Sequence, residues 1–148
     1  MKKCWFPVLC LVLVLPLLLA FGCAGGAAQT KASAVSVTCD EFTKQKDIVK
    51  DLSVTSGGMF TVTLCSNGST GFTWGQNSTI SDPQILQQTD YKTVAAGNTG
   101  GAVGVPGTEV WTFKALKAGA ASVSMAYSRP WAGGEKGVQT FTLNVTVK

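Results

Sequence analysis

The dominant pattern along this chain is an alternation of apolar and polar side chains with a period of two. It is clearest near the C-terminal end, where Phe141, Leu143 and Val145 alternate with threonine and asparagine. Such a period places successive side chains on opposite faces of a strand, one dry and one wet. No stretch shows a helical period of any length. Strands are therefore predicted at residues 35–38, 49–54, 59–65, 72–74, 86–93, 111–113, 122–127 and 138–147.

The segments between these strands are rich in glycine, asparagine, serine and proline, which favour turns. Seven to eight short strands separated in this way predict an all-β fold, a β-sandwich of two antiparallel sheets. Trp74, Trp111 and Phe141 are expected to anchor its core. Tight turns are expected at residues 57–58 and 117–119.

The order of the strands also predicts where the connecting loops lie. In an antiparallel domain, every second connection emerges at the same end. When residues 35–38 and 49–54 are treated as one strand region, the loops at residues 66–71, 94–108 and 128–137 are each two strands apart. We therefore expect these three loops to share one end of the sandwich.

The first residues have the order of an export signal: a short positive start, an apolar run and small residues. Two lysines precede an apolar run from residue 4 to 19, which Pro7 and Pro16 interrupt. We therefore predict a signal peptide at residues 1–22. The run is about as long as a marginal membrane span, so a retained membrane anchor is the alternative.

Cys23 follows a small residue at the end of this segment, which resembles a bacterial lipobox, where the cysteine is lipidated. Phe21 departs from that pattern, because smaller residues are commoner at its place. We expect lipidation at Cys23, a flexible tether at residues 23–33 and a folded domain at residues 34–148. The chain would then be anchored to the cell envelope, on its periplasmic or extracellular face. An ordinary cleaved signal is the alternative.

Two further cysteines, Cys39 and Cys65, remain beyond the signal. An even pair in an exported chain predicts a disulfide. Such a bridge would stabilise the domain by roughly 3–4 kcal/mol in the chain-entropy model. Two free buried thiols are the alternative. A catalytic cysteine is disfavoured, because the chain contains no histidine to activate it.

The composition argues against enzymatic functions. Among its 148 residues the chain has no histidine, which removes the usual general base and most zinc sites. The acidic Asp40 and Glu41 are adjacent rather than spaced for glycoside hydrolysis, and no glycine-rich phosphate loop opens a helix. Loss of Lys2 and Lys3 with the signal lowers the net charge from +4 to about +2, which is too weak to indicate nucleic-acid binding. We expect no enzyme activity, no cofactor and no metal.

Three predicted loops carry patterns that stand out together. They read Asn67-Gly68-Ser69-Thr70-Gly71-Phe72, then Gly104-Val105-Pro106-Gly107, then Arg129-Pro130-Trp131. In this order and spacing they resemble the chagasin family, the inhibitors of papain-like cysteine proteases. That family carries an Asn-Pro-Thr-Thr-Gly-aromatic loop, a Gly-x-Gly-Gly loop and an Arg-Pro-Trp loop on an immunoglobulin-like sandwich. The resemblance covers about residues 34–148.

The chain departs from the family pattern at four loop positions. Gly68 stands where the family has proline, Ser69 where it usually has threonine, and Pro106 replaces a glycine. Ala132 occupies a place that is often acidic, although Glu135 is close by. Because Gly68 lacks the fixed φ of proline, ordering the free loop on binding could cost roughly 0.4–1 kcal/mol more.

The resemblance implies a role for each loop at the cleft of a papain-like protease, with its Cys–His pair. Ser69-Thr70-Gly71 would form a wedge in the cleft, while Phe72 anchors that loop from beneath. The second loop would offer exposed backbone groups at Gly104 and Gly107 for strand-like hydrogen bonding. Trp131, held by Pro130, is the expected hot spot, and Arg129 could pair with acidic residues at the rim.

Simpler interpretations stand beside these roles. Trp131 could fold back over the end of the sandwich, Arg129 could only pair with Glu135, and Asn67-Gly68 is also an ordinary hairpin turn signal. We expect a monomeric, reversible inhibitor of papain-like cysteine proteases that binds a protease and the membrane but no nucleic acid. The alternative is a non-inhibitory adhesion or assembly module of the cell envelope, with sugar binding as a distant third.

Overall fold

The computed structural model describes residues 33–97 and 104–148 of the chain. The predicted signal peptide, the lipidation site Cys23 and all but the last residue of the predicted tether lie outside these residues. Residues 98–103, which belong to the longest predicted loop, lie outside them as well. Within the described residues, no helix is both long and apolar enough to cross a membrane.

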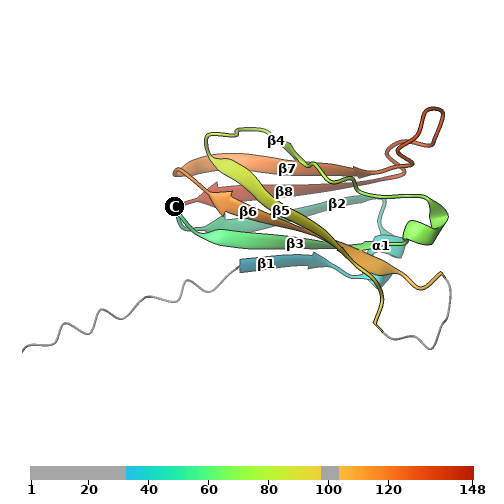
Figure 1. Ribbon diagram of the computed structural model, residues 1–148. Helices are drawn as coiled ribbons and strands as arrows, with labels where there is room; N and C mark the ends of the chain where they lie inside the picture. The colour runs from blue at the N-terminus through green and yellow to red at the C-terminus, as the bar shows by residue number, and fades with distance from the viewer. Residues whose placement is uncertain (1–32, 98–103) are drawn as a thin grey trace, which may run out of the picture.

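The described residues form eight strands, one short helix and one 3₁₀ turn. In chain order these are β1 (Ser33–Val37), α1 (Cys39–Lys44), β2 (Asp47–Val54), β3 (Met59–Ser66), η1 (Gly68–Thr70), β4 (Thr79–Ile80), β5 (Leu86–Val94), β6 (Gly107–Ala115), β7 (Gly119–Tyr127) and β8 (Gln139–Val147). Two four-stranded sheets, ordered β1-β3-β6-β5 and β2-β8-β7-β4, lie face to face (Figure 1). The predicted all-β sandwich is therefore confirmed.

The edges of the sheets differ from the simple antiparallel expectation. Strand β1 pairs in parallel with β3, and β2 pairs in parallel with β8, while the remaining pairs are antiparallel. The two N-terminal strands belong to different sheets, so treating residues 35–38 and 49–54 as one strand region was wrong. The predicted strand at residues 72–74 is reduced to a single bridge between Thr73 and Ser128.

Helix α1 is the reason that the N-terminal segment divides between the sheets. It turns the chain back between β1 and β2, and the side-chain Oγ1 of Thr38 caps it by accepting from the backbone N–H of Glu41. This Thr-x-x-Glu spacing is the capping-box signature. The helix has six residues, too few for a visible helical period, so the capping box was the available signal in the sequence.

The core lies between the two sheets and follows the predicted alternation. The inward positions of β6 and β8 are buried in phase, and Trp74, Trp111 and Phe141 are all buried as predicted. The rings of Phe60 and Phe113 stack with their centroids 5.1 Å apart. Each such side chain stabilises the fold by about 1.5–3 kcal/mol through burial.

The predicted disulfide between Cys39 and Cys65 is present, with the two Cα atoms 5.0 Å apart. It joins the first residue of α1 to the end of β3, next to the connection that follows Ser66. The bridge therefore fastens the helix directly beneath one of the three predicted loops.

The three predicted loops do emerge at one end of the sandwich, and α1 lies at the same end (Figure 1). The tight turn between β6 and β7 lies at the opposite end, near the C-terminus (Figure 1). Strands β3, β5 and β7 run toward the loops, and β6 and β8 run away from them, which follows from their antiparallel pairing.

Candidate functional site

We call the loops that share this end loop 1 (residues 67–72), loop 2 (104–107) and loop 3 (129–137), and together the rim. Loop 1 is a single 3₁₀ turn in which the N–H groups of Thr70 and Gly71 donate to the carbonyls of Asn67 and Gly68, at 3.1 and 3.0 Å. The Thr70 hydroxyl donates to the same Asn67 carbonyl at 2.6 Å. Gly68, Ser69 and Thr70 are exposed at the tip.

Loop 3 is in direct contact with loop 1 through Trp131 and Gly71. A Cβ placed on Gly71 would lie only 2.5 Å from Cη2 of Trp131, so the indole rests against the bare backbone of loop 1. Gly71 also has a φ of +78°, a conformation that favours glycine. The indole is 51% exposed, so it does not seal the core as the simpler interpretation required.

Arg129 holds loop 3 in place from inside the rim. Its guanidinium lies 4.5 Å from the centre of the Phe72 ring, and its Nη1 lies 3.2 Å from a carboxylate oxygen of Glu135. The side chain of Lys136 also donates to the carbonyls of Arg129 and Trp131. The pairing of Arg129 with Glu135 is therefore present, and loop 3 is braced by its own side chains.

Loop 2 meets loop 1 on the other side. The Nδ2 of Asn67 donates to the carbonyl of Gly104 at 3.2 Å, and Val105 is exposed beside them. Gly107 is already paired with Ser66 in the β3–β6 ladder, and a Cβ there would lie 2.4 Å from the carbonyl oxygen of Val94. Gly107 therefore serves the close approach of two strands, whereas Gly104 remains on the exposed surface.

An aromatic cluster supports loop 1 from below. The ring of Phe72 stacks on Tyr127 at 5.4 Å, and Phe42 of α1 packs edge-on against Tyr127 and Trp74. The Tyr127 hydroxyl accepts a hydrogen bond from the backbone N–H of Asn67 at 2.9 Å. Phe72 thus lies where the sequence predicted an anchor, whereas the contributions of Phe42 and Tyr127 were missed.

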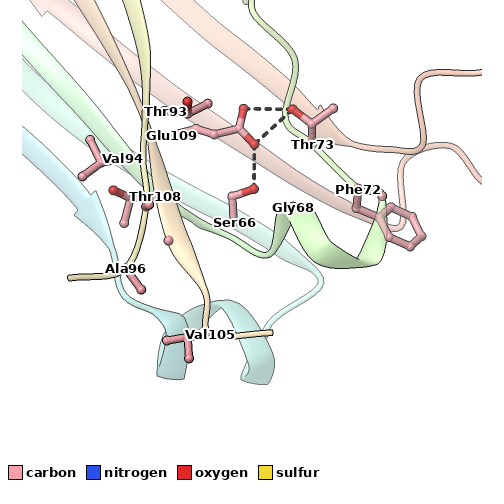
Figure 2. A pocket seen from close by; sticks show the side chains of 13 residues that line it. Ser66, Gly68, Phe72, Thr73, Thr93, Val94, Ala96, Val105, Thr108 and Glu109 are labelled. Carbon is pink, nitrogen blue, oxygen red and sulfur yellow. Dashed lines mark hydrogen bonds between the residues drawn. The ribbon is translucent and has the colours of Figure 1, made fainter. Parts of the chain in front are cut away.

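A buried carboxylate at the root of the loops was also missed. Glu109 is only 2% exposed and accepts hydrogen bonds from Ser66 and Thr73, which Figure 2 shows, and from Trp74 and Tyr91. Its position is in phase with the buried Trp111 and Phe113 of β6, and a charge at such a position was the available signal in the sequence.

The surroundings of Glu109 also perturb its neighbour Tyr91. Burial, together with the hydrogen bond and the negative charge of Glu109, raises the pKa of Tyr91 to about 12. A cavity of about 490 Å³ lies beside Glu109, between loop 1 and the strands that lead into loop 2 (Figure 2). No group of three His, Cys, Asp or Glu side chains that could hold a metal occurs in the described part of the chain.

Comparison with known proteins identifies the family to which this chain belongs. The model of the family described as "Chagasin family peptidase inhibitor I42" matches residues 53–145, which include all three loops. The chain belongs to the chagasin family of peptidase inhibitors. The resemblance inferred from the three motifs is therefore confirmed, and an inhibitor family agrees with the prediction that the chain is not an enzyme.

Known proteins of similar sequence or structure show how far the likeness of this chain extends. Amoebiasin-2 of Entamoeba histolytica is 28% identical over 104 residues, which cover 70% of this chain and 82% of that protein. The crystal structure of the cysteine protease inhibitor EhICP2 from Entamoeba histolytica superposes with a TM-score of 0.58 at 22% identity, over 80% of this chain and 98% of that one.

A second solved structure, PbICP-C in complex with falcipain-2, superposes with the same TM-score of 0.58 at 15% identity. It covers 79% of this chain and 100% of PbICP-C. At these identities the two structures support the fold, a chagasin-type immunoglobulin-like sandwich, and the family match carries the relationship.

Proposed function

We propose that this protein is a reversible inhibitor of papain-like cysteine proteases and that its rim blocks the active-site cleft. The proposal is supported by membership of a peptidase-inhibitor family and by two relatives of similar fold. One of them is described as a cysteine protease inhibitor, and the other was solved in complex with falcipain-2. A non-inhibitory envelope module is not favoured by these relationships.

The observation that carries the proposal is the continuity of the rim. Asn67 of loop 1 is hydrogen-bonded to Gly104 of loop 2, and Trp131 of loop 3 rests on Gly71 of loop 1. These loops are far apart in the sequence, yet they present one exposed edge with the tip of loop 1 in the middle. A single copy of the chain carries this whole edge, so we propose that it acts as a monomer.

The shape of loop 1 explains why such an inhibitor would escape cleavage. A scissile peptide bond has to be held in line with the attacking thiolate, at about 3–3.5 Å. Residues Gly68–Thr70 instead form a 3₁₀ turn, closed by the bonds from Thr70 and Gly71 back to Asn67 and Gly68. Loop 1 can therefore enter the cleft as a wedge without presenting an extended backbone for attack.

The exposed Trp131 would supply much of the affinity. Tryptophan is enriched among the residues that dominate interface energetics, and an immobilised side chain loses little entropy on binding. Here the indole is already held by loop 1, and the carbonyl of Trp131 accepts from the Lys136 side chain at 3.1 Å. The exposed Thr70 would contribute a hydroxyl near the catalytic pair.

The test is an inhibition assay with papain and the purified chain. We expect competitive inhibition that is reversed by dilution, with the chain recovered uncut. Trp131→Ala should raise the inhibition constant at least fivefold, since hot-spot truncation costs 1 kcal/mol or more. Its melting temperature should remain close to that of the wild type, because the indole is half exposed. Absence of inhibition at micromolar concentration for papain-like enzymes would refute the proposal.

For the cellular site, we propose export followed by lipid attachment at Cys23, so that the domain is displayed on a tether at the cell envelope. Support comes from the N-terminal sequence: a positive start, an apolar run and a cysteine after a small residue. Mass spectrometry of the mature wild-type chain should show Cys23 as its first residue with acyl chains attached, and Cys23→Ser should lack this lipid mass. A wild-type chain without the lipid, whether cut elsewhere or still carrying residues 1–22, would contradict lipid attachment.

A further inference from the structure

We propose that Glu109 is a positioning residue that ties the roots of loop 1 and loop 2 together and so holds the rim in its inhibitory shape. The inference rests on the proposed function, since it concerns the same rim. It assigns to a buried residue outside the three loop motifs an influence on protease affinity that acts through the position of the loops.

The carboxylate of Glu109 joins the two ends of loop 1. Its Oε1 accepts from the Ser66 hydroxyl at 2.7 Å, directly before the loop, and from the Trp74 backbone N–H at 3.1 Å, just after it. The Thr73 hydroxyl lies 3.0 Å from both carboxylate oxygens. This carboxylate therefore helps to set the distance between the entry and the exit of the wedge, together with the bond from the Trp74 indole N–H to the Cys65 carbonyl at 2.9 Å.

The same carboxylate also joins the two strands that carry loop 2. Glu109 lies on β6, two residues after Gly107, and its Oε2 accepts from the hydroxyl of Tyr91 on β5 at 2.8 Å. Figure 2 shows Ser66 and Thr73 converging on the carboxylate. The β3–β6 ladder already pairs Ser66 with Gly107, and Glu109 extends this connection to β5 and to the far end of loop 1.

Packing alone does not fix this spacing. The cavity of about 490 Å³ separates loop 1 from the loop 2 side, and it is lined by Gly68, Gly71 and Phe72 on one side and by Val94 and Val105 on the other. Where side chains leave such a space, van der Waals contact cannot hold the two loops at a set distance. Hydrogen bonds can do so: the bond from Asn67 to Gly104 acts at the exposed rim, and those of Glu109 act at the inner end of that space.

A carboxylate is a costly residue for a purely structural position. Burying a charge is unfavourable unless it is well hydrogen-bonded, and an apolar side chain often serves the same packing better. The ion pairs among the described residues, Glu41 with Lys50 and Arg129 with Glu135, do not include Glu109. Its partners are neutral donors, which makes it a hub for positioning hydrogen bonds.

Loss of this hub should lower affinity by releasing the rim. If the binding-competent arrangement falls to a fraction of the population, the apparent dissociation constant rises by the inverse of that fraction. A change from nearly all molecules to about one in ten would raise the inhibition constant about tenfold.

The test is Glu109→Gln in the full chain, assayed with papain. Glutamine keeps the size of the side chain but removes the charge and turns one acceptor oxygen into an NH₂ donor, so the charge-assisted bonds weaken and at least one hydroxyl has to accept rather than donate. The matched control is Val145→Ala, a buried residue of β8 at the end opposite the rim. Val145→Ala should lower the melting temperature and leave the inhibition constant within twofold, whereas Glu109→Gln should raise that constant about tenfold.

A second readout separates this inference from the proposed function. Amide hydrogen exchange at Thr70 and Gly71 should be faster in Glu109→Gln and unchanged in Val145→Ala, because these amides close the loop 1 turn. Wild-type exchange and affinity in Glu109→Gln would overturn the inference, as would equal weakening by both variants. If the wild-type chain fails to inhibit, the proposed function falls, and the exchange rates still decide whether Glu109 holds loop 1.

Discussion

Replacing Gly71 by alanine tests whether loop 1 and loop 3 act as one surface. A Cβ at this position would lie 2.5 Å from Cη2 of Trp131, and Gly71 has a φ of +78°. The left-handed backbone costs alanine about 1 kcal/mol or somewhat more relative to glycine. Because carbon atoms pack at about 3.5–4.0 Å, the indole has to move away from loop 1 by about 1 Å.

The two effects should appear in different measurements. The indole is half exposed and can yield, so the free energy of unfolding should fall by little more than the backbone cost of about 1 kcal/mol. Protease binding should suffer more, because a displaced tryptophan loses its complementarity. A loss of about 1–2 kcal/mol would raise the inhibition constant against papain about 5- to 30-fold.

Gly57→Ala is the matched control for this prediction. Gly57 has a φ of +79°, has no atom within 4 Å of an added Cβ, and lies in the turn before β3, at the end opposite the rim. It should reproduce the loss of unfolding free energy, measured in urea, and leave the inhibition constant unchanged. The double variant Gly71→Ala/Trp131→Ala should inhibit no worse than Trp131→Ala alone. Wild-type inhibition by Gly71→Ala would refute the reasoning.

Three further predictions concern the supports of the rim. Joint replacement of Cys39 and Cys65 by serine should lower the free energy of unfolding by about 3.5 kcal/mol in the chain-entropy model, because the bridge spans 26 residues. A loss below about 1 kcal/mol, measured by urea titration, would contradict this prediction. The pKa of Tyr91 is raised to about 12 in the folded chain, against about 10 when unfolded, so its contribution to stability is complete below pH 10 and is lost as the pH rises through 12. Between pH 10 and pH 12, the free energy of unfolding of the wild type should therefore fall more steeply than that of Tyr91→Phe. Parallel pH–stability curves for the two proteins would contradict this prediction. Arg129→Ala removes both the contact with Phe72 and the ion pair with Glu135, so it should lower the free energy of unfolding by about 1 kcal/mol and weaken inhibition. Glu135→Gln removes only the ion pair and should lower the free energy of unfolding by less than half as much. Equal effects of the two variants would show that the contact with Phe72 is unimportant.

Much of the scaffold could be predicted from local pattern. Strands β3, β6, β7 and β8 follow the two-residue alternation, because one face of each is buried and the period is a property of the extended backbone itself. Strand β5 was predicted as well, but it buries only Leu86 and its register shifts between Gln88 and Asp90. The buried Trp111 and Phe141 and the disulfide partners were predictable for similar reasons. Helix α1 was missed, because six residues are too few to show a helical period and the N-cap residue Thr38 was its only sequence signal.

By itself, then, the sequence determined most of the strands, the order of the loops and the family motifs, since each of these is encoded by neighbouring residues. It did not determine β4 (Thr79–Ile80), and the strand predicted at residues 72–74 is a single bridge. Only the tertiary structure decided that Trp131 rests on Gly71, and that Glu109 binds residues on both sides of loop 1. These partners are brought together by strand pairing and sheet packing. Contacts between residues so far apart depend on register and on the distance between sheets, which no local pattern encodes.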